Sequence, residues 1–183
     1  MDKENIWVSN GFKAIYKLKL DDTYKTVLKK SVYDTLKGFK SNQNLSLQEI
    51  ENELLVTSEK GVYKYETTSD NFVLSTKFND VLGQDVFVKF LKQDTFGNIW
   101  FVKDNEVGFI DNLDNIKYKI STLPVYLMND KITRFFENII PLTTNTILLC
   151  TENGFAFYNK NKLLLATKPI KVLLSQIKTE SNR

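Results

Sequence analysis

Apolar and polar residues alternate in short runs along this chain, and this pattern predicts β-strands. Between residues 13 and 20, Ile15 and Tyr16 fall on opposite faces of a run with a period of two, which is typical of a strand. The segment from Val86 to Leu91 is almost continuously apolar, as in a strand buried on both faces. Polar pairs such as Asp21-Asp22 interrupt the runs and predict turns. We therefore expect a protein that is nearly all β.

One arrangement recurs four times: an apolar quartet is followed within a few residues by a glycine. The quartets are Ile6–Ser9, Leu54–Thr57, Ile99–Val102 and Leu148–Thr151. Their second residues, which we expect to be structurally equivalent, are Trp7, Leu55, Trp100 and Leu149, spaced by 48, 45 and 49 residues. A repeat of about 40–50 residues that contains strands and a glycine is typical of a β-propeller blade.

The expected fold class is therefore all-β, a β-propeller fragment of about four blades over residues 1–167, with the first blade lacking its inner strand. The expected inner strands are 45–50, 86–91 and 135–142; the central hairpins 54–65, 99–110 and 146–158; the outer strands 24–33, 72–76, 116–120 and 163–166; and the crossing loops 80–85 and 123–131. After Lys168-Pro169, residues 168–183 do not continue the repeat and are interpreted as a linker and the first strand of another domain.

Composition excludes several classes of protein. The 183 residues are 42% hydrophobic and 13% aromatic, which is too apolar for a disordered chain. The net charge of +3 argues against nucleic-acid binding as the main role. The single cysteine, Cys150, aligns with apolar strand positions and is expected to be a buried packing residue. No apolar run approaches the ~20 residues of a membrane helix, and the polar segment Met1–Asn5 lacks the apolar stretch of a signal peptide.

The sequence offers little catalytic chemistry, so we expect neither an enzyme nor a cofactor. There is no histidine, which excludes histidine-based triads and histidine-ligated metals. Arg134 and Arg183 are the only arginines, too few for an arginine cluster. A glycosidase with paired carboxylates stays possible in principle, but acids such as Asp94 stand at turns, where structural roles are common. Trp7 and Trp100 occupy repeat-equivalent positions and are interpreted as interblade core residues.

The repeat resembles a known family. The segment from Asp94 to Phe101 contains Asp94, Gly97-Asn98 and Ile99-Trp100, and it resembles the Asp-x-x-Gly-Asn-Ile-Trp repeat of the two-component regulator propellers. Segments 59–65 and 152–159 resemble the hairpin that follows this motif, and segment 168–174 resembles the entry to the immunoglobulin-like three-Y domain. The second and fourth repeats depart from the pattern, with leucine in place of tryptophan.

The resemblance implies the sensor region of a membrane-spanning two-component or LuxR-type transcriptional regulator of the kind common in Bacteroidetes. It implies a periplasmic or extracytoplasmic location, a non-catalytic role and a carbohydrate fragment as ligand. The expected partners are the remaining propeller blades and the three-Y domain, and no nucleic acid. The apolar faces left at both ends of an incomplete ring also predict a homo-oligomer through these faces, aggregation, or a longer parent chain, and a four-bladed ring that closes on itself is the alternative. The alternatives are a protein-interaction propeller scaffold or a propeller-fold glycoside hydrolase or lyase.

A ligand site is predicted where loop length varies most, at the end of the ring that carries the blade connections and the central hairpin turns. The candidate ligand-binding residues at this end are Glu59, Lys60, Asp104, Glu106, Asp130, Arg134, Phe135 and Glu152. Arg134 is the only internal arginine and precedes Phe135, so its fork of donors beside an aromatic ring could hold a sugar acid or a carboxylate of the adjoining domain. A salt bridge that pins a loop is the alternative interpretation of Arg134.

Overall fold

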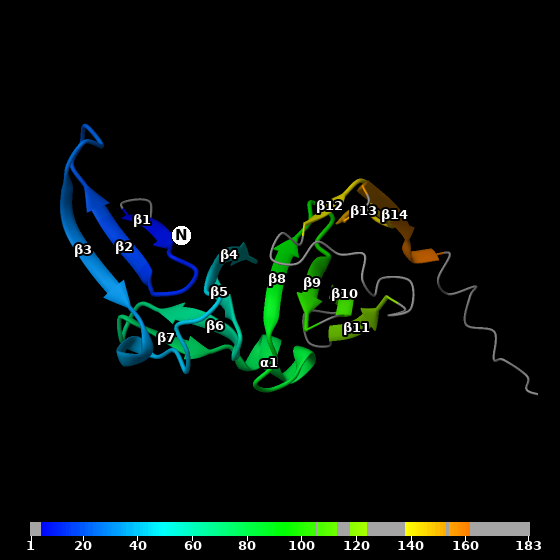
Figure 1. The fold of residues 1–183 in the computed structure, drawn as a ribbon, viewed down its shortest axis with the longest axis horizontal. Helices are drawn as coiled ribbons and strands as arrows, with labels where there is room; N and C mark the ends of the chain where they lie inside the picture. The colour runs from blue at the N-terminus through cyan, green and yellow to red at the C-terminus, as the bar shows by residue number, and fades with distance from the viewer. Residues whose placement is uncertain (1–4, 105, 113–117, 124–137, 153, 162–183) are drawn as a thin grey trace, which may run out of the picture.

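The computed structural model describes residues 5–104, 106–112, 118–123, 138–152 and 154–161, which form four antiparallel β-sheets (Figure 1). The first sheet comprises β1 (Asn5–Ser9), β2 (Ile15–Leu20) and β3 (Val27–Tyr33); the second β4 (Ser46–Ile50), β5 (Glu53–Ser58), β6 (Gly61–Glu66) and β7 (Asn71–Leu74); the third β8 (Val88–Gln93), β9 (Ile99–Lys103), β10 (Glu106–Asn112) and β11 (Tyr118–Thr122); and the fourth β12 (Ile139–Pro141), β13 (Thr146–Thr151) and β14 (Gly154–Asn159). Two short helices, η1 (Thr35–Lys37) and α1 (Thr76–Leu82), lie in the connections that flank the second sheet. The prediction of an all-β chain is confirmed.

Each sheet is a simple meander in which strands pair in chain order. The first sheet has three described strands, as expected for a repeat without its inner strand, and the second and third have four. In the fourth sheet, β12 covers residues 139–141 of the predicted inner strand 135–142, and β13 and β14 form the predicted hairpin. Residues 135–137, the predicted crossing loop after Leu123, the predicted outer strand 163–166 and the predicted start of another domain, 168–183, lie outside the described residues. The described strands thus form antiparallel sheets in chain order, and the assignment of these sheets to propeller blades stays a prediction.

The sheets pack face to face in chain order, with one apolar core between each neighbouring pair. In β5, Leu55 faces the core shared with the third sheet, and the next residue, Val56, faces the core shared with the first sheet. In β9, Phe101 and Trp100 divide in the same way between the cores toward the second and fourth sheets. Because successive strand residues point to opposite faces, an almost continuous apolar strand supplies two cores at once.

Each of the three interfaces also contains a lysine ammonium that lies over aromatic rings. Lys17 of the first sheet lies 5.1 Å from the ring centroid of Tyr65 in the second sheet. Lys77 of α1 forms an ion pair with Glu51 at the second sheet and lies 5.0 Å from the ring of Tyr118 in the third. Lys160, which follows β14, is described below. Cation–π contacts of this kind are worth about 0.5–2 kcal/mol, more where the site is desolvated, so each interface joins apolar packing to a half-buried cation.

Helix α1 is a correction to the predicted strand 72–76 and the predicted crossing loop 80–85. The strand ends at Leu74, and α1 follows from Thr76 to Leu82, just under two helical turns. Phe78 and Leu82, four residues apart, enter the core between the second and third sheets. Asn79 is buried, and its amide accepts a hydrogen bond from the Val62 N–H (3.1 Å) and donates one to the Val62 carbonyl (2.7 Å). The segment after β7 is therefore helical because two of its side chains fill the core and a third forms hydrogen bonds with the backbone of β6. Within the described ranges, no helix has the length and apolarity that crossing a bilayer requires.

The predicted equivalence of four positions is correct for three. Trp7, Leu55 and Trp100 each face the sheet that follows, whereas Leu149 is buried against the sheet that precedes it. The turn before β13 closes with Leu142 N–H to the Thr146 carbonyl, which matches Asp94 N–H to the Asn98 carbonyl before β9. This match aligns Leu148, one residue earlier than predicted, with Trp100.

The two outermost faces of the stack expose apolar side chains. On β1, Ile6 and Val8 are 44% and 41% exposed, on the face opposite Trp7. On β14, Phe155 and Phe157 are 71% and 74% exposed, and the paired β13 places the half-buried Cys150 beside them. Cys150 is therefore less buried than expected. Exposed apolar faces are present at both ends, and self-association through them stays a prediction.

Asp70 connects the first two sheets and should give the fold a dependence on pH. Its Oδ1 accepts hydrogen bonds from the Tyr33 hydroxyl of β3 and the Tyr65 hydroxyl of β6, each at 2.6 Å. The Tyr33 hydrogen bond, followed by that of Tyr65, lowers the pKa of Asp70 below its usual value of 3.8. A carboxyl whose pKa falls on folding contributes stability above its unfolded pKa, and this contribution is lost as the pH falls through the lowered folded value.

We therefore expect Asp70→Asn to reduce the free energy of unfolding by about 1 kcal/mol at pH 7, below the usual range for hydrogen bonds to a charged group because the site is partly exposed. The deficit should shrink as the pH falls below about 4. Urea denaturation at pH 7, 5 and 3 measures it, with the exposed Asp22→Asn as the matched control. A deficit that is the same at all three pH values would contradict this role of the carboxylate.

Candidate functional site

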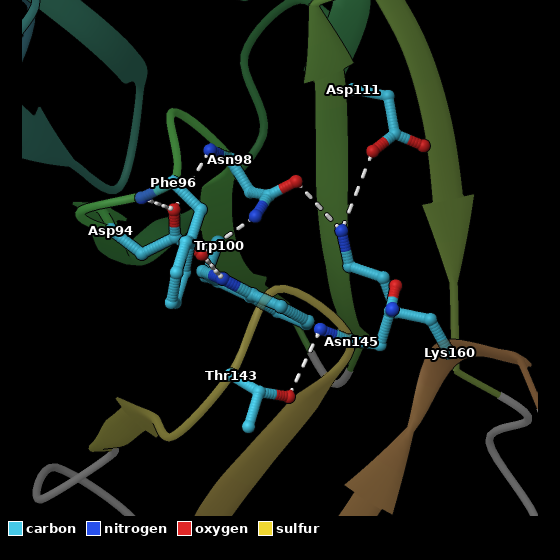
Figure 2. A network of polar contacts seen from close by, with 8 residues as sticks. All are labelled: Asp94, Phe96, Asn98, Trp100, Asp111, Thr143, Asn145 and Lys160. Carbon is cyan, nitrogen blue, oxygen red and sulfur yellow. Dashed lines mark hydrogen bonds and ion pairs between the residues drawn. The ribbon is translucent and has the colours of Figure 1, made fainter.

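Asp94 explains why the Asp-x-x-Gly-Asn-Ile-Trp segment has its residues in this order. One carboxylate oxygen of Asp94 accepts the backbone N–H groups of Phe96 and Asn98, both at 2.9 Å, and closes the turn. The other accepts the Asn98 side-chain amide at 2.8 Å and the Trp100 indole N–H at 2.9 Å. Gly97 has φ +86°, a left-handed value that glycine adopts without strain. The motif is thus a structural unit in which one buried carboxylate fixes both the turn and the core tryptophan (Figure 2).

Lys160 brings the fourth sheet onto this turn. Its ammonium donates to Asn98 Oδ1 at 2.7 Å and lies 3.4 Å from Asp111 Oδ1 on β10. It also lies 4.0 Å from the ring centroid of Phe109 and 5.1 Å from that of Trp100. The Lys160 side chain is only 11% exposed, and its backbone N–H bonds the Asn145 carbonyl in the turn before β13. Figure 2 shows the lysine reaching across the two sheets toward Asn98 and Asp111.

A cavity of about 340 Å³, here called the Lys160 groove, lies between the third and fourth sheets beside this lysine. Its residues are the aromatic Phe96, Phe109 and Tyr158, the amides Asn98, Asn145 and Asn161, the hydroxyls Ser121 and Thr144, and the charged Asp111, Lys119 and Lys160. Phe96 lines this groove and is 50% exposed, so its ring is accessible to a ligand. Aromatic walls with a few convergent polar groups are typical of small-ligand sites.

Tyr158 carries an unsatisfied polar group at this groove. Its hydroxyl oxygen is buried, and no described residue forms a hydrogen bond with it. Burial raises the pKa of Tyr158 above 10.0, so the phenol stays protonated at neutral pH. A buried hydroxyl without a partner costs free energy, so a polar ligand atom that reached it would bind more tightly.

The groove is suited to binding a polar ligand with one apolar face. Two lysines, Lys119 and Lys160, stand against one carboxylate, Asp111, so the local charge favours an anion. Amide and hydroxyl groups both donate and accept hydrogen bonds, as a hydroxyl-rich ligand requires. Within the described part of the chain, no three or more His, Cys, Asp or Glu side chains gather in a way that could hold a metal ion.

Comparison with known proteins gives the fold a context. No family model matches the chain, and no curated protein matches it. Among the solved structures similar to it are two of the extracellular domain of BT4673 from B. thetaiotaomicron, described as a one component system in one and as a hybrid two component system in the other. Each gives a TM-score of 0.55 and covers 87% of this chain, at 15% and 16% sequence identity.

This likeness is one of fold alone. The match covers 21% of the BT4673 chain, so the present chain corresponds to a small part of that extracellular domain. The neighbours agree loosely with the family that the repeat motif resembles, and they are extracellular domains of a regulatory system.

The described members of the sequence-predicted site lie in hairpin turns, at the opposite end of the sheets from the Lys160 groove. In the third sheet, the groove lies where β9 starts, β10 ends and β11 starts. The β9–β10 hairpin turn lies at the other end of these strands. The described candidates at these turns are Glu59, Lys60, Asp104, Glu106 and Glu152. Asp130, Arg134 and Phe135 lie outside the described residues.

The described candidates mostly have local partners. Glu59 accepts a hydrogen bond from the Asn44 amide at 2.6 Å, and Glu106 lies 3.5 Å from the Lys103 ammonium on the same hairpin. Asp104 occupies the turn with φ +45°, and Glu152 is exposed. A ligand role for these residues stays a prediction. The Lys160 groove was not predicted from the sequence. The one local signal that could have indicated it is that Lys160 directly follows a strand rich in aromatic residues.

Proposed function

We propose that this chain is part of the extracytoplasmic β-propeller sensor of a membrane-spanning two-component or transcriptional regulator, and that its four sheets are consecutive blades. The observation that carries the proposal is the stack itself: like meanders pack face to face in chain order and leave an apolar face open at each end. The likeness to a small part of a longer extracellular domain supports it. In this proposal the open faces pack against further blades of the parent chain, and a three-Y domain follows.

The ligand of this sensor is a carbohydrate fragment, and the Lys160 groove is where it binds. An exposed aromatic ring can lie against the apolar face of a sugar ring, while the amides and hydroxyls bind its hydroxyl groups. The excess of lysine over carboxylate favours a fragment that carries a carboxylate, such as a uronic acid. Binding across two sheets would couple the ligand to the angle between them, which is how such a site could transmit a signal.

The test is titration of the chain with uronic-acid and matched neutral disaccharides, followed calorimetrically. Lys119→Met changes an exposed groove residue and should leave the fold intact, and Lys160→Met removes the central cation. Losing a charge-assisted hydrogen bond should weaken binding of the acidic disaccharide by roughly 10- to 100-fold. The exposed Lys25→Met, in the β2–β3 turn, is the matched control and should bind normally. Equal affinity in all four proteins would remove the groove from the site.

A further inference from the structure

A second cavity, of about 370 Å³, lies beside Trp7 where the first and second sheets meet, and we call it the Trp7 pocket. Its aromatic residues are Trp7 and Tyr65. Its polar residues include Asn52 and Glu53, at the turn before β5 and the start of β5, and Glu66 and Thr67, at the end of β6 and just after it. No residue of this pocket belongs to the Lys160 groove. The volume is within the range of small-ligand sites.

The two tryptophans of the chain occupy equivalent repeat positions but have different surroundings. Trp100 is fully buried, and its indole N–H is bonded to Asp94 six residues earlier. Six residues before Trp7 stands Met1, which has no carboxylate to offer. Trp7 is half-buried, and no described residue accepts a hydrogen bond from its indole N–H. The core role predicted for both tryptophans is thus complete for Trp100, whereas Trp7 also presents an open donor.

The aromatic wall of the Trp7 pocket is rigid. The Tyr65 ring stands against Trp7 at a centroid distance of 4.7 Å and an interplanar angle of 67°, and the Tyr65 hydroxyl is tied to Asp70. Behind them, Phe72 packs edge-on against Trp7 at 5.9 Å. A site built on residues that are already ordered loses less conformational entropy when a ligand binds.

The polar groups define the chemistry of the occupant. The charged residues of the pocket lining are Glu53, Glu66 and Lys64. The lining therefore has no excess of positive charge and does not favour an anionic ligand, unlike the lysine excess of the Lys160 groove. The indole N–H can donate to an acceptor, the glutamates can accept from donors, and the aromatic rings can lie against an apolar face. A neutral sugar ring has all three.

We propose that the Trp7 pocket is a binding site for a neutral saccharide unit, separate from the Lys160 groove. It goes beyond the proposed function because it adds a second site with a different charge preference at another interface of the stack. A receptor with both sites would recognise a neutral unit at one interface and an acidic unit at another.

Tryptophan fluorescence tests the proposal, because Trp7 and Trp100 are the only tryptophans and only Trp7 lines the pocket. The probes are glucose, galactose, mannose and xylose with their β-1,4-linked disaccharides, and galacturonic acid is the charged comparator. A neutral probe should change the emission in a saturable manner. Trp7→Phe keeps a ring but removes the N–H, and should weaken binding roughly 3- to 10-fold when measured by calorimetry.

Two further variants keep the outcome clear if Trp7→Phe perturbs the fold. Glu53→Gln alters an exposed rim residue and should also weaken binding, whereas Phe12→Ala removes an exposed aromatic ring outside the pocket and should not. Lys160→Met should leave the neutral-saccharide response unchanged even if it abolishes binding of the acidic fragment. The proposal is overturned if no neutral probe binds, if binding survives both Trp7→Phe and Glu53→Gln, or if galacturonic acid binds more tightly than every neutral probe to the Lys160→Met protein, in which the other site is disabled.

Discussion

Replacing Asp94 with alanine is expected to reduce the free energy of unfolding by roughly 3–5 kcal/mol, because the buried carboxylate accepts four hydrogen bonds. The Trp100 indole N–H would remain buried without an acceptor, and an unsatisfied buried donor costs about 1–3 kcal/mol by itself. The turn would also lose the acceptor that orders the backbone of Phe96 and Asn98. Urea denaturation followed by Trp100 fluorescence measures both effects.

Two comparisons make the Asp94 prediction specific. Asp94→Asn keeps the shape and one acceptor oxygen, so it should lose roughly half as much stability as Asp94→Ala. Asp22→Ala removes an exposed aspartate at another turn and should change stability by less than about 0.5 kcal/mol. If Asp94→Ala were no more harmful than Asp22→Ala, the carboxylate would not be the centre of the motif.

Gly38→Ala is expected to cost a similar amount, roughly 3–5 kcal/mol, for a different reason. Gly38 has φ +105°, and a Cβ atom there would overlap the backbone carbonyl oxygen of Phe72. Because that oxygen belongs to the β-sheet backbone, it cannot rotate away as a flexible side chain could. The strained connection would move Phe39, which packs in the core between the first and second sheets.

The chain contains a graded set of controls for Gly38. Gly97 has φ +86° but open space around its Cβ position, so Gly97→Ala should cost only about 1 kcal/mol. Gly11 has neither a left-handed φ nor a close neighbour, so Gly11→Ala should be nearly neutral. Thermal and urea denaturation of the three variants should place Gly38 well above Gly97, and Gly97 above Gly11. Any other order would show that the space around Gly38 is not the limiting factor.

The strand order was predictable because each repeat carries its own local signals. Alternating runs and the apolar quartets with their following glycines repeat at similar spacing, so an error in one unit is corrected by the others. The predicted equivalence of Leu149 with Trp100 was wrong because Ile147, Leu148 and Leu149 are all large and apolar. Such a run has no alternation that indicates which residue faces which core. Helix α1 was not predicted because its helical spacing of apolar residues, Phe78 and Leu82, extends over one turn only. So short a pattern cannot be distinguished from the end of a strand.

The Lys160 groove could not have been predicted in the same way. It is assembled from segments as distant as Asn98 and Lys160, which no local pattern relates. The side chains of the Asp94 turn have obvious structural roles, so sequence reasoning assigned them no other, and loop-length variation drew attention to the hairpin turns at the other end. Only the packing of two sheets shows that a structural turn also borders a cavity.

The recurrence of one kind of interface has an evolutionary consequence. Each junction between sheets joins an apolar face of one repeat to an apolar face of the next, with a lysine over aromatic rings. A gene duplication or unequal recombination that inserted one whole repeat would create a new junction from two faces that already fit that type of partner. The number of repeats in such a protein can therefore drift between relatives while each junction keeps its chemistry, and similarity between distant relatives should survive in single repeats longer than in whole-chain alignment.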